Sequence, residues 1–178
     1  MSISQRFGDR IPTPLADVWA VVDSHGALVQ LDLHGGRNAP RDRIELEKKY
    51  REQGFELEWR PAALKHVARA LKAYFHADPD ALDLPVAPEG SPFQQEVWHE
   101  LRKVPYGKTV SYGELARRVG RPGAARAVGR ANATNPISLV IPCHRVVGND
   151  GSLTGYGGGM DRKEALLRHE GALTGLFP

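Results

Sequence analysis

The chain has 178 residues, of which 25% are charged and 41% hydrophobic, and its formal net charge is +3. This composition is typical of a globular protein with one domain or two small ones. No apolar run approaches the ~20 residues that span a bilayer, and the start of the chain lacks the apolar stretch of a signal peptide, so we expect a cytoplasmic protein.

The positive charge is concentrated in the second half of the chain. Residues 1–90 hold 12 Lys and Arg against 14 Asp and Glu, whereas residues 91–178 hold 12 against 7. The stretch 102–130 carries eight basic residues and one acidic residue, Glu114. Such a stretch is either a solvated basic face or a surface for a polyanion such as DNA, and the charges alone leave both interpretations open.

The first half of the chain predicts strands and then helices. Apolar runs at 18–23 and 27–33 predict a β-hairpin. A charged helix is expected around 43–53, and an amphipathic helix over 61–76. The segment 77–92 is rich in proline and acidic residues, and we expect it to link an N-terminal domain to a C-terminal one.

Start and stop signals predict the helices of the second half. Capping boxes at 91–94 and 111–114 each begin a helix, and the second of these stops at Gly120. The next helix covers 124–133 and ends before Pro136. Two short arginine-rich helices across a tight turn form a helix-turn-helix pattern, although such pairs also occur in ordinary helical cores.

The last part of the chain predicts a strand, a loop and a helix. The apolar run 137–142 predicts a buried strand that leads into Cys143. The segment 148–159 has six glycines, which suit a loop whose backbone amides approach a ligand closely. A final helix is expected to begin with a capping box at Asp161 and to end at Gly171.

Cys143, in the sequence IPCHRV, is the only cysteine. One cysteine excludes an internal disulfide and zinc sites built on cysteine pairs, and the spacing of the histidines suggests no metal. A lone buried cysteine is usually a small hydrophobe. It reacts only as thiolate, so its usual pKa of about 8.5 must be lowered by cations or hydrogen bonds. His144 and Arg145 adjoin it, but neighbouring side chains on an extended segment point to opposite sides.

Glu170 is unusual because it lies in the last turn of the final helix. A carboxylate there faces the negative end of the helix dipole, which costs roughly 0.3–1 kcal/mol unless another group holds it. Either Glu170 is exposed and tolerated, or it belongs to a Cys143–His144–Glu170 chain. In that chain the histidine takes the thiol proton and the glutamate orients the histidine.

The region 105–170 resembles the O6-alkylguanine-DNA alkyltransferase family through several motifs in order. They are PYGKTVSYGELA, AARAVGRANATNP, IPCHRVVG, GYGGG and KEALLRHEG, and TPLADVWAVVDSHGALVQLDL and SPFQQEVWHELRKVPYG are similar more loosely. The resemblance implies an α/β (α+β) fold with two domains. Residues 1–85 would form a structural, ribonuclease H-like domain of β-sheet and helices. Residues 86–178 would form a mainly helical, winged helix-turn-helix-like domain for DNA binding and alkyl transfer.

The resemblance also implies a function, direct-reversal DNA repair without a cofactor. The alkyl group of O6-alkylguanine, and also of O4-alkylthymine, would pass irreversibly from duplex DNA to Cys143. The partner would be double-stranded DNA, bound through its minor groove by a monomer, with the damaged base flipped out and cooperative binding left open. A thioether is too poor a leaving group for water to displace, so each molecule would act once.

Five residues match the family's reaction centre. Cys143 would attack the alkyl carbon, while His144, acting through a water molecule, and Glu170 keep the sulfur ionised. Tyr112 would donate a proton or hydrogen bond to the guanine ring. Asn135 would brace the turn between the recognition helix and the active-site strand.

Another group of residues matches the family's DNA-binding helix. Arg126 would occupy the space that the flipped nucleotide leaves, although an isolated arginine on a basic helix is more often a phosphate contact. The small residues Ala125, Ala127 and Gly129 would let the helix approach a groove, and Arg130 would contact the DNA from the same helix. Tyr112 is also expected to contact the DNA.

The remaining matches line the base pocket. The carbonyl groups of Cys143 and Val146 would accept hydrogen bonds from the guanine amino group. Tyr156, Gly157 and Gly158 would lie near the departing oxygen. Several family members have serine in place of Gly157, which could change the range of alkyl groups accepted.

The sequence departs from the family in two other ways, and two functions other than alkyl transfer remain open. The N-terminal zinc ligands of animal members and the cysteine-rich N-terminal module of some bacterial members are absent from the sequence.

A cysteine hydrolase would also use a cysteine, a histidine and an acid, but would turn over repeatedly. A protein that only binds damaged DNA would need no reactive thiol.

Overall fold

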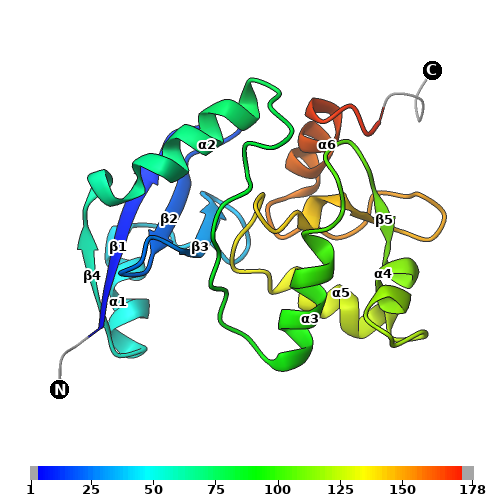
Figure 1. Ribbon diagram of the computed structural model, residues 1–178, viewed down its shortest axis with the longest axis horizontal. Coiled ribbons are helices and arrows are strands. Elements are labelled where there is room, and N and C mark those ends of the chain that lie inside the picture. Colours follow the sequence, from blue (N-terminus) through cyan, green and yellow to red (C-terminus); the bar gives the residue numbers. More distant parts are fainter. Residues whose placement is uncertain (1–3, 174–178) are drawn as a thin grey trace. The chain divides into compact units, whose positions relative to one another are not determined.

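The computed structural model describes residues 4–173, which divide into two compact units, one ending at Pro88 and the other beginning at Glu89. Helices and strands occur in both units (Figure 1). The mixed α/β class expected from the sequence is therefore confirmed.

The N-terminal unit is built on a four-stranded sheet with the strand order β3-β2-β1-β4. Strands β1, β2 and β3 pair antiparallel, and β4 lies parallel to β1. The hairpin expected over 18–33 is confirmed, whereas β1 and β4 were not predicted. The elements of this unit are β1 (Ser4–Ile11), β2 (Val18–Val22), β3 (Leu28–Leu33), α1 (Arg43–Glu52), β4 (Phe55–Trp59), the 3-10 helix η1 (Pro61–Leu64) and α2 (Lys65–Phe75).

Strand β2 is buried along its whole length, which explains why its sequence is apolar without alternation. Side chains of β2 alternate between the two faces of the sheet. On one face, Trp19 and Val21 pack in a cluster with Leu46 and Tyr50 of α1. Helix η1 contacts β1 and β2, and α2 continues from it along the sheet (Figure 1).

Part of the expected linker belongs to the N-terminal sheet. The amide of Leu28 donates to the carbonyl of Pro85 (2.9 Å), and the amide of Ala87 donates to the carbonyl of Leu28 (2.7 Å). Val86 forms an isolated parallel bridge with Leu28. Residues 85–87 therefore lie along the outer edge of β3 at Leu28.

The C-terminal unit packs three helices, α3, α4 and α5, against one another. Strands β5 and β6 form a short parallel pair that joins Val110 to Val146 and Ser111 to Val147. The elements are α3 (Pro92–Leu101), β5 (Val110–Ser111), α4 (Tyr112–Arg118), α5 (Ala125–Ala133), the 3-10 helix η2 (Cys143–Arg145), β6 (Val146–Val147) and α6 (Met160–His169).

The helix start signals are confirmed at two of three places. Ser91 forms a full capping box with Gln94. Ser111 forms the N-cap half of a box by accepting a hydrogen bond from the amide of Glu114 (3.1 Å), while the Glu114 side chain pairs with Arg117 and Arg118. The capping box expected at Asp161 is wrong, because α6 already begins after Gly159, whose φ of +100° favours glycine. Asp161 lies in the first turn of α6 instead.

Candidate active site

Cys143 is the first residue of η2, and its side chain is buried. The strand expected over 137–142 is wrong, because this segment folds into successive turns around the side chain of Asn135. The Asn135 amide nitrogen Nδ2 donates to the carbonyl of Ile141 (2.8 Å), and its oxygen Oδ1 accepts from the amide of Ile137 (2.9 Å). Asn135 therefore sets the path by which the chain reaches Cys143, at the position where the sequence predicted a brace.

The structure brings His144 and Glu170 together in the interior of the C-terminal unit. Nε2 of His144 lies 2.8 Å from Oε1 of Glu170, and both side chains are fully buried. Glu170 is the C-cap residue of α6, so its unfavourable position at the helix end is offset by these contacts. The contact between His144 and Glu170 is the one that the sequence predicted.

Arg145 is directed at Glu170 and not at the thiol. Its guanidinium donates through Nε to Oε2 (2.9 Å) and through Nη2 to Oε1 (2.9 Å) of Glu170, and through Nη1 to the carbonyl of Val104 (2.6 Å). The backbone amide of Gly107 also donates to Oε2 of Glu170 (3.3 Å). Arg145 therefore neutralises Glu170, a role that was not predicted from the sequence.

These contacts fix the charge states of the pair. Burial alone would raise the pKa of Glu170, but the hydrogen bonds from His144 and Arg145 and the charge of Arg145 outweigh it and hold the pKa well below its usual value of 4.5. Burial lowers the pKa of His144, against the opposing effect of Glu170. Glu170 is thus an ionised acceptor, and neutral His144 carries its hydrogen on Nε2.

The second ring nitrogen of His144 is consequently a proton acceptor. Nδ1 is buried and has no hydrogen-bond partner among residues 4–173. A buried polar atom without a partner is uncommon, and in many structures it marks a place for a water molecule or a reacting group. His144 can therefore take up one proton on Nδ1 while Glu170 stabilises the resulting charge.

Lys163 is a second buried cation near the thiol, and it was not predicted from the sequence. The side chain is completely buried, and its Nζ donates to the carbonyl of Val146 (2.5 Å) and to the carbonyl of Thr154 (2.6 Å). Burial lowers the pKa of Lys163 from 10.5 to about 8, while interaction with Cys143 opposes that shift. Lys163 joins the strand after Cys143 to the glycine-rich loop.

The thiol experiences opposing influences. Burial raises the pKa of Cys143, whereas the amide of Asn135 and the charge of Lys163 lower it. Because burial dominates, the resting thiol is protonated at neutral pH and needs a base in order to react.

Tyr112, the first residue of α4, lies between α5 and the glycine-rich loop. A methyl group added at Gly129 of α5 would lie 3.6 Å from Cε1 of Tyr112, and one added at Gly155 would lie 3.9 Å from its hydroxyl. Gly157 is open, since an added methyl group would meet no atom within 4 Å. Tyr156, Gly157 and Gly158 follow Gly155 in this loop and are partly buried.

Helix α5 presents a shallow hollow of about 710 Å³. Arg126 and Arg130 are exposed at this hollow, and the other residues that line it are small: Gly123, Ala124, Ala127, Gly129 and Ala133. Four of the six residues that the sequence predicted for DNA binding thus meet on one surface. Ala125 and Tyr112 are not part of its lining.

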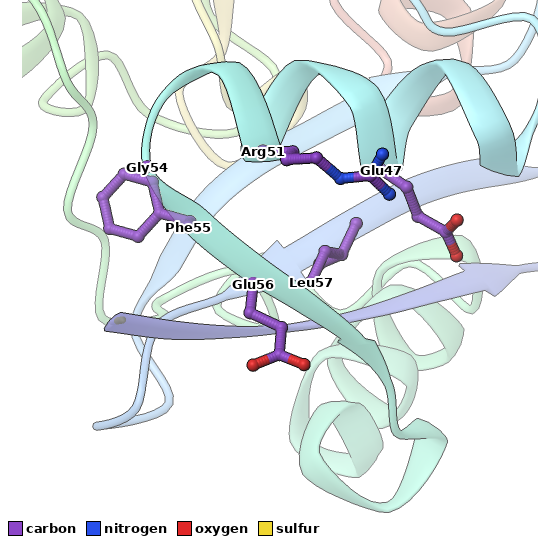
Figure 2. Close-up of a pocket in the computed structure, with 6 residues that line it drawn as sticks. All are labelled: Glu47, Arg51, Gly54, Phe55, Glu56 and Leu57. Atoms are coloured by element: carbon purple, nitrogen blue, oxygen red, sulfur yellow. The ribbon is translucent and has the colours of Figure 1, made fainter. Parts of the chain in front are cut away.

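A separate pocket lies in the N-terminal unit between α1 and β4 (Figure 2). Its volume is about 580 Å³, and its lining consists of Glu47, Arg51, Gly54, Phe55, Glu56 and Leu57. The guanidinium of Arg6 stacks on the ring of Phe55, 4.1 Å from its centroid. The pocket offers neither a cysteine nor a histidine, so it is not the reaction centre.

The described part of the chain contains neither a cluster of metal ligands nor a membrane-spanning helix. Residues 4–173 contain no cluster of three or more His, Cys, Asp or Glu side chains that could hold a metal ion. Within the same range, no helix has the length and apolar character that crossing a membrane requires.

Comparison with known proteins gives one consistent result. The model of the family described as "6-O-methylguanine DNA methyltransferase, DNA binding domain" matches residues 92–172. The methylated-DNA--protein-cysteine methyltransferase of Salmonella typhimurium is 47% identical over 93% of this chain and 95% of its own length. That of Methanosarcina barkeri is 43% identical over 91% of this chain and 95% of its own length.

Solved structures agree in fold as well. The crystal structure of Mycobacterium tuberculosis OGT in complex with DNA has a TM-score of 0.76 and 36% identity, and the match covers 94% of this chain and 93% of that one. The O6-methylguanine-DNA methyltransferase of Pyrococcus kodakaraensis has a TM-score of 0.64 and 25% identity, and the match covers 93% of this chain and 99% of that one. The chain therefore belongs to the methylated-DNA--protein-cysteine methyltransferase family.

Proposed function

We propose that this chain repairs duplex DNA by moving the alkyl group of O6-alkylguanine onto Cys143, irreversibly and once per molecule. The observation that carries the proposal is the buried His144–Glu170 pair beside the single cysteine, in a unit whose helix α5 presents exposed arginines. The family relationship supports the same chemistry. The similar Mycobacterium tuberculosis protein crystallised in complex with DNA, which supports double-stranded DNA as the partner of this chain.

The reaction follows from the charge states of the site. His144 takes the thiol proton on Nδ1, directly or through a water molecule, and Glu170 stabilises the imidazolium. The sulfur of Cys143 then forms a bond to the alkyl carbon as the bond from that carbon to O6 breaks. Tyr112 supplies a proton to the guanine ring, so that the base leaves neutral. The products are S-alkylcysteine and an unmodified guanine.

The surrounding residues have supporting roles in this proposal. Asn135 holds the turns before the thiol, and Lys163 keeps a positive charge beside the developing thiolate. The carbonyl groups of Cys143 and Val146 read the guanine amino group, while Tyr156, Gly157 and Gly158 lie near the departing oxygen.

Binding is proposed to occur in the minor groove, with the damaged base flipped out of the stack. Arg126 fills the space left by that base. Ala125, Ala127 and Gly129 keep the surface of α5 low enough for close approach, and Arg130 adds a contact. The protein acts as a monomer in the cytoplasm, and O4-alkylthymine is a second substrate.

The proposal extends to the finer description of the fold. The meander β1-β2-β3 with β4 parallel to β1 supports a ribonuclease H-like N-terminal domain over 1–85 with a structural role. The helices α4 and α5, with the β5–β6 pair beside them, support a winged helix-turn-helix-like domain over 86–178 that binds DNA and carries out the transfer.

The decisive experiment is the intact mass of the protein after incubation with a duplex that contains O6-methylguanine, followed by peptide mapping. We expect a gain of one methyl group at Cys143, saturating at one per molecule, and no gain in Cys143→Ala. An unchanged mass with the duplex still bound would place the chain among proteins that only bind damage. Repeated turnover of an ester or peptide would instead indicate a hydrolase.

A further inference from the structure

Most arginines of the helix-turn-helix segment are held in ion pairs within the C-terminal unit. Arg117 and Arg118 of α4 both contact Glu114, at 2.6 Å and 3.2 Å, and Arg121 contacts Glu96 at 3.0 Å. The guanidinium groups of Arg126 and Arg130, in contrast, make no ion pair or hydrogen bond with any residue in 4–173. The uncompensated charge of this segment is therefore concentrated on α5.

The two arginines lie on the same side of α5, because they are four residues apart. Four helical residues rise about 6 Å, which is close to two base-pair steps of ~3.4 Å each. Both line the hollow of about 710 Å³, and between them the helix surface carries only glycine and alanine. Two long cationic side chains are thus exposed on a surface whose other side chains are small.

We infer that Arg130 is a specificity-determining residue, which enters the minor groove about two base pairs from Arg126 and selects damaged sites with a narrow groove. This inference rests on the proposed function, because it concerns how the same duplex is held. A·T-rich segments have a narrow minor groove with an enhanced negative potential, which attracts arginine. A G·C pair places the guanine 2-amino group in the minor groove and opposes close approach.

The test uses three duplexes that each contain one O6-methylguanine and differ only in the neighbouring base pairs: A·T, G·C, or inosine·C. Inosine lacks the 2-amino group, so an inosine·C pair presents the minor groove of an A·T pair and keeps the major-groove oxygen and ring nitrogen of a G·C pair. Equilibrium binding is measured in the Cys143→Ala background, so that transfer does not intervene. We expect the A·T and inosine·C duplexes to bind about tenfold more tightly than the G·C duplex.

Replacing Arg130 by alanine should remove most of this preference, and Arg130→Lys should restore only part of it, because lysine is the weaker minor-groove cation. Arg168→Ala is the matched control, since Arg168 is an exposed arginine of the same unit that pairs with Glu164 on its own helix (2.7 Å). The control should keep the tenfold ratio. Thermal unfolding of each variant confirms that the fold is intact.

Two results would overturn the inference. One is an equal loss of affinity for all three duplexes in Arg130→Ala, with a salt dependence reduced by about one ion, which would make Arg130 a phosphate contact. The other is an absence of any dependence on the neighbouring pairs in the protein with arginine at 130. If the unaltered protein, incubated with the same duplexes, transfers no methyl group to Cys143 from any of them, the proposed function is contradicted instead, so the two failures are distinguishable.

Discussion

The carboxylate of Glu170 lies 2.8 Å from Nε2 of His144, and neither side chain is exposed to solvent. The replacement Glu170→Gln keeps the shape but leaves Arg145 as a buried cation without its partner. Removing one partner of a buried pair costs about 3–5 kcal/mol, so we expect the free energy of unfolding in denaturant to fall by that amount. Glu164→Gln is the control, because Glu164 pairs with Arg168 on the exposed side of α6; it should cost about 0.5 kcal/mol or less.

The Glu170 carboxylate should also make the free energy of unfolding depend on pH under acidic conditions. The folded-state pKa of Glu170 is held below the usual 4.5, so the unfolded chain binds a proton first as the pH falls. The contribution of Glu170 to stability is therefore complete above pH 4.5 and is lost progressively below it. Unfolding measured between neutral pH and acid should show a shallower decline for Glu170→Gln than for the unaltered protein. Parallel curves would contradict the ionised state of Glu170.

Lys163→Met should make the thiol harder to ionise. Methionine keeps the length of the side chain but removes the charge that opposes the burial of Cys143, so the pKa of Cys143 should rise further. Transfer from free O6-benzylguanine, followed as a function of pH, should then require a higher pH for half of its maximal rate. Lys163→Arg keeps the charge and should shift the profile less. An unshifted profile in Lys163→Met would show that this lysine only holds the loop.

Gly107→Ala should disturb the site through the backbone. Gly107 has φ +73°, and a methyl group there would lie 2.8 Å from the carbonyl oxygen of Glu170. Gly120 has a similar φ of +70° but no atom within 4 Å of an added methyl group. Gly120→Ala therefore measures the backbone strain alone, about 1 kcal/mol. We expect Gly107→Ala to lose about 1–3 kcal/mol more in denaturant unfolding, and equal losses would exclude the clash.

Gly157→Ser should fold normally and change the reaction. The position is open and its φ lies outside the region that favours glycine, so stability should stay within about 0.5 kcal/mol. In the proposed function the hydroxyl lies near the departing oxygen, so the ratio of transfer rates for methyl and benzyl groups should change. Gly159→Ser is the comparison for stability. The φ of Gly159 is +100°, where a side chain is strained, so this variant should lose stability. An unchanged ratio would place Gly157 away from the reacting atoms.

Arg126→Ala should affect duplex DNA more than a free base. Only the duplex requires a flipped nucleotide to be replaced in the stack, so the rate of transfer from O6-methylguanine in duplex should fall by a larger factor than the rate from free O6-benzylguanine. Single-turnover rates for both substrates give the two factors. Equal factors for the two substrates would show that Arg126 does not fill the space left by the flipped nucleotide.

The sequence predicted those parts of the fold whose signals are local. The capping box at Ser91 and the apolar strands β2 and β3 depend on nearby residues or on burial from both sides. Strand β1 was missed because charged residues interrupt its apolar ones, and β4 because it is only partly buried and carries two glutamates among its five residues. The turns over 137–142 were read as a strand because the side chain of Asn135, and not the apolar run, determines their path.

The sequence identified a site residue where its position was energetically unfavourable, and missed one whose position looked ordinary. Glu170 at a helix end attracted attention, and its partner His144 adjoins the single cysteine. Lys163 lies in a charged run that reads as a solvated face, although its spacing to Leu166, Leu167 and Glu170 follows the buried stripe of α6. A lysine on the apolar side of an amphipathic helix is the signal that would have identified it.

In the proposed function, two groups at α6 act on the sulfur from a distance, Glu170 through His144 and Lys163 through its charge. Both follow Cys143 in the chain, by 27 and 20 positions. A ribosome therefore completes the nucleophile before it completes the groups that activate it. In the proposed function, the ability of Cys143 to accept an alkyl group therefore arrives only when α6 has docked.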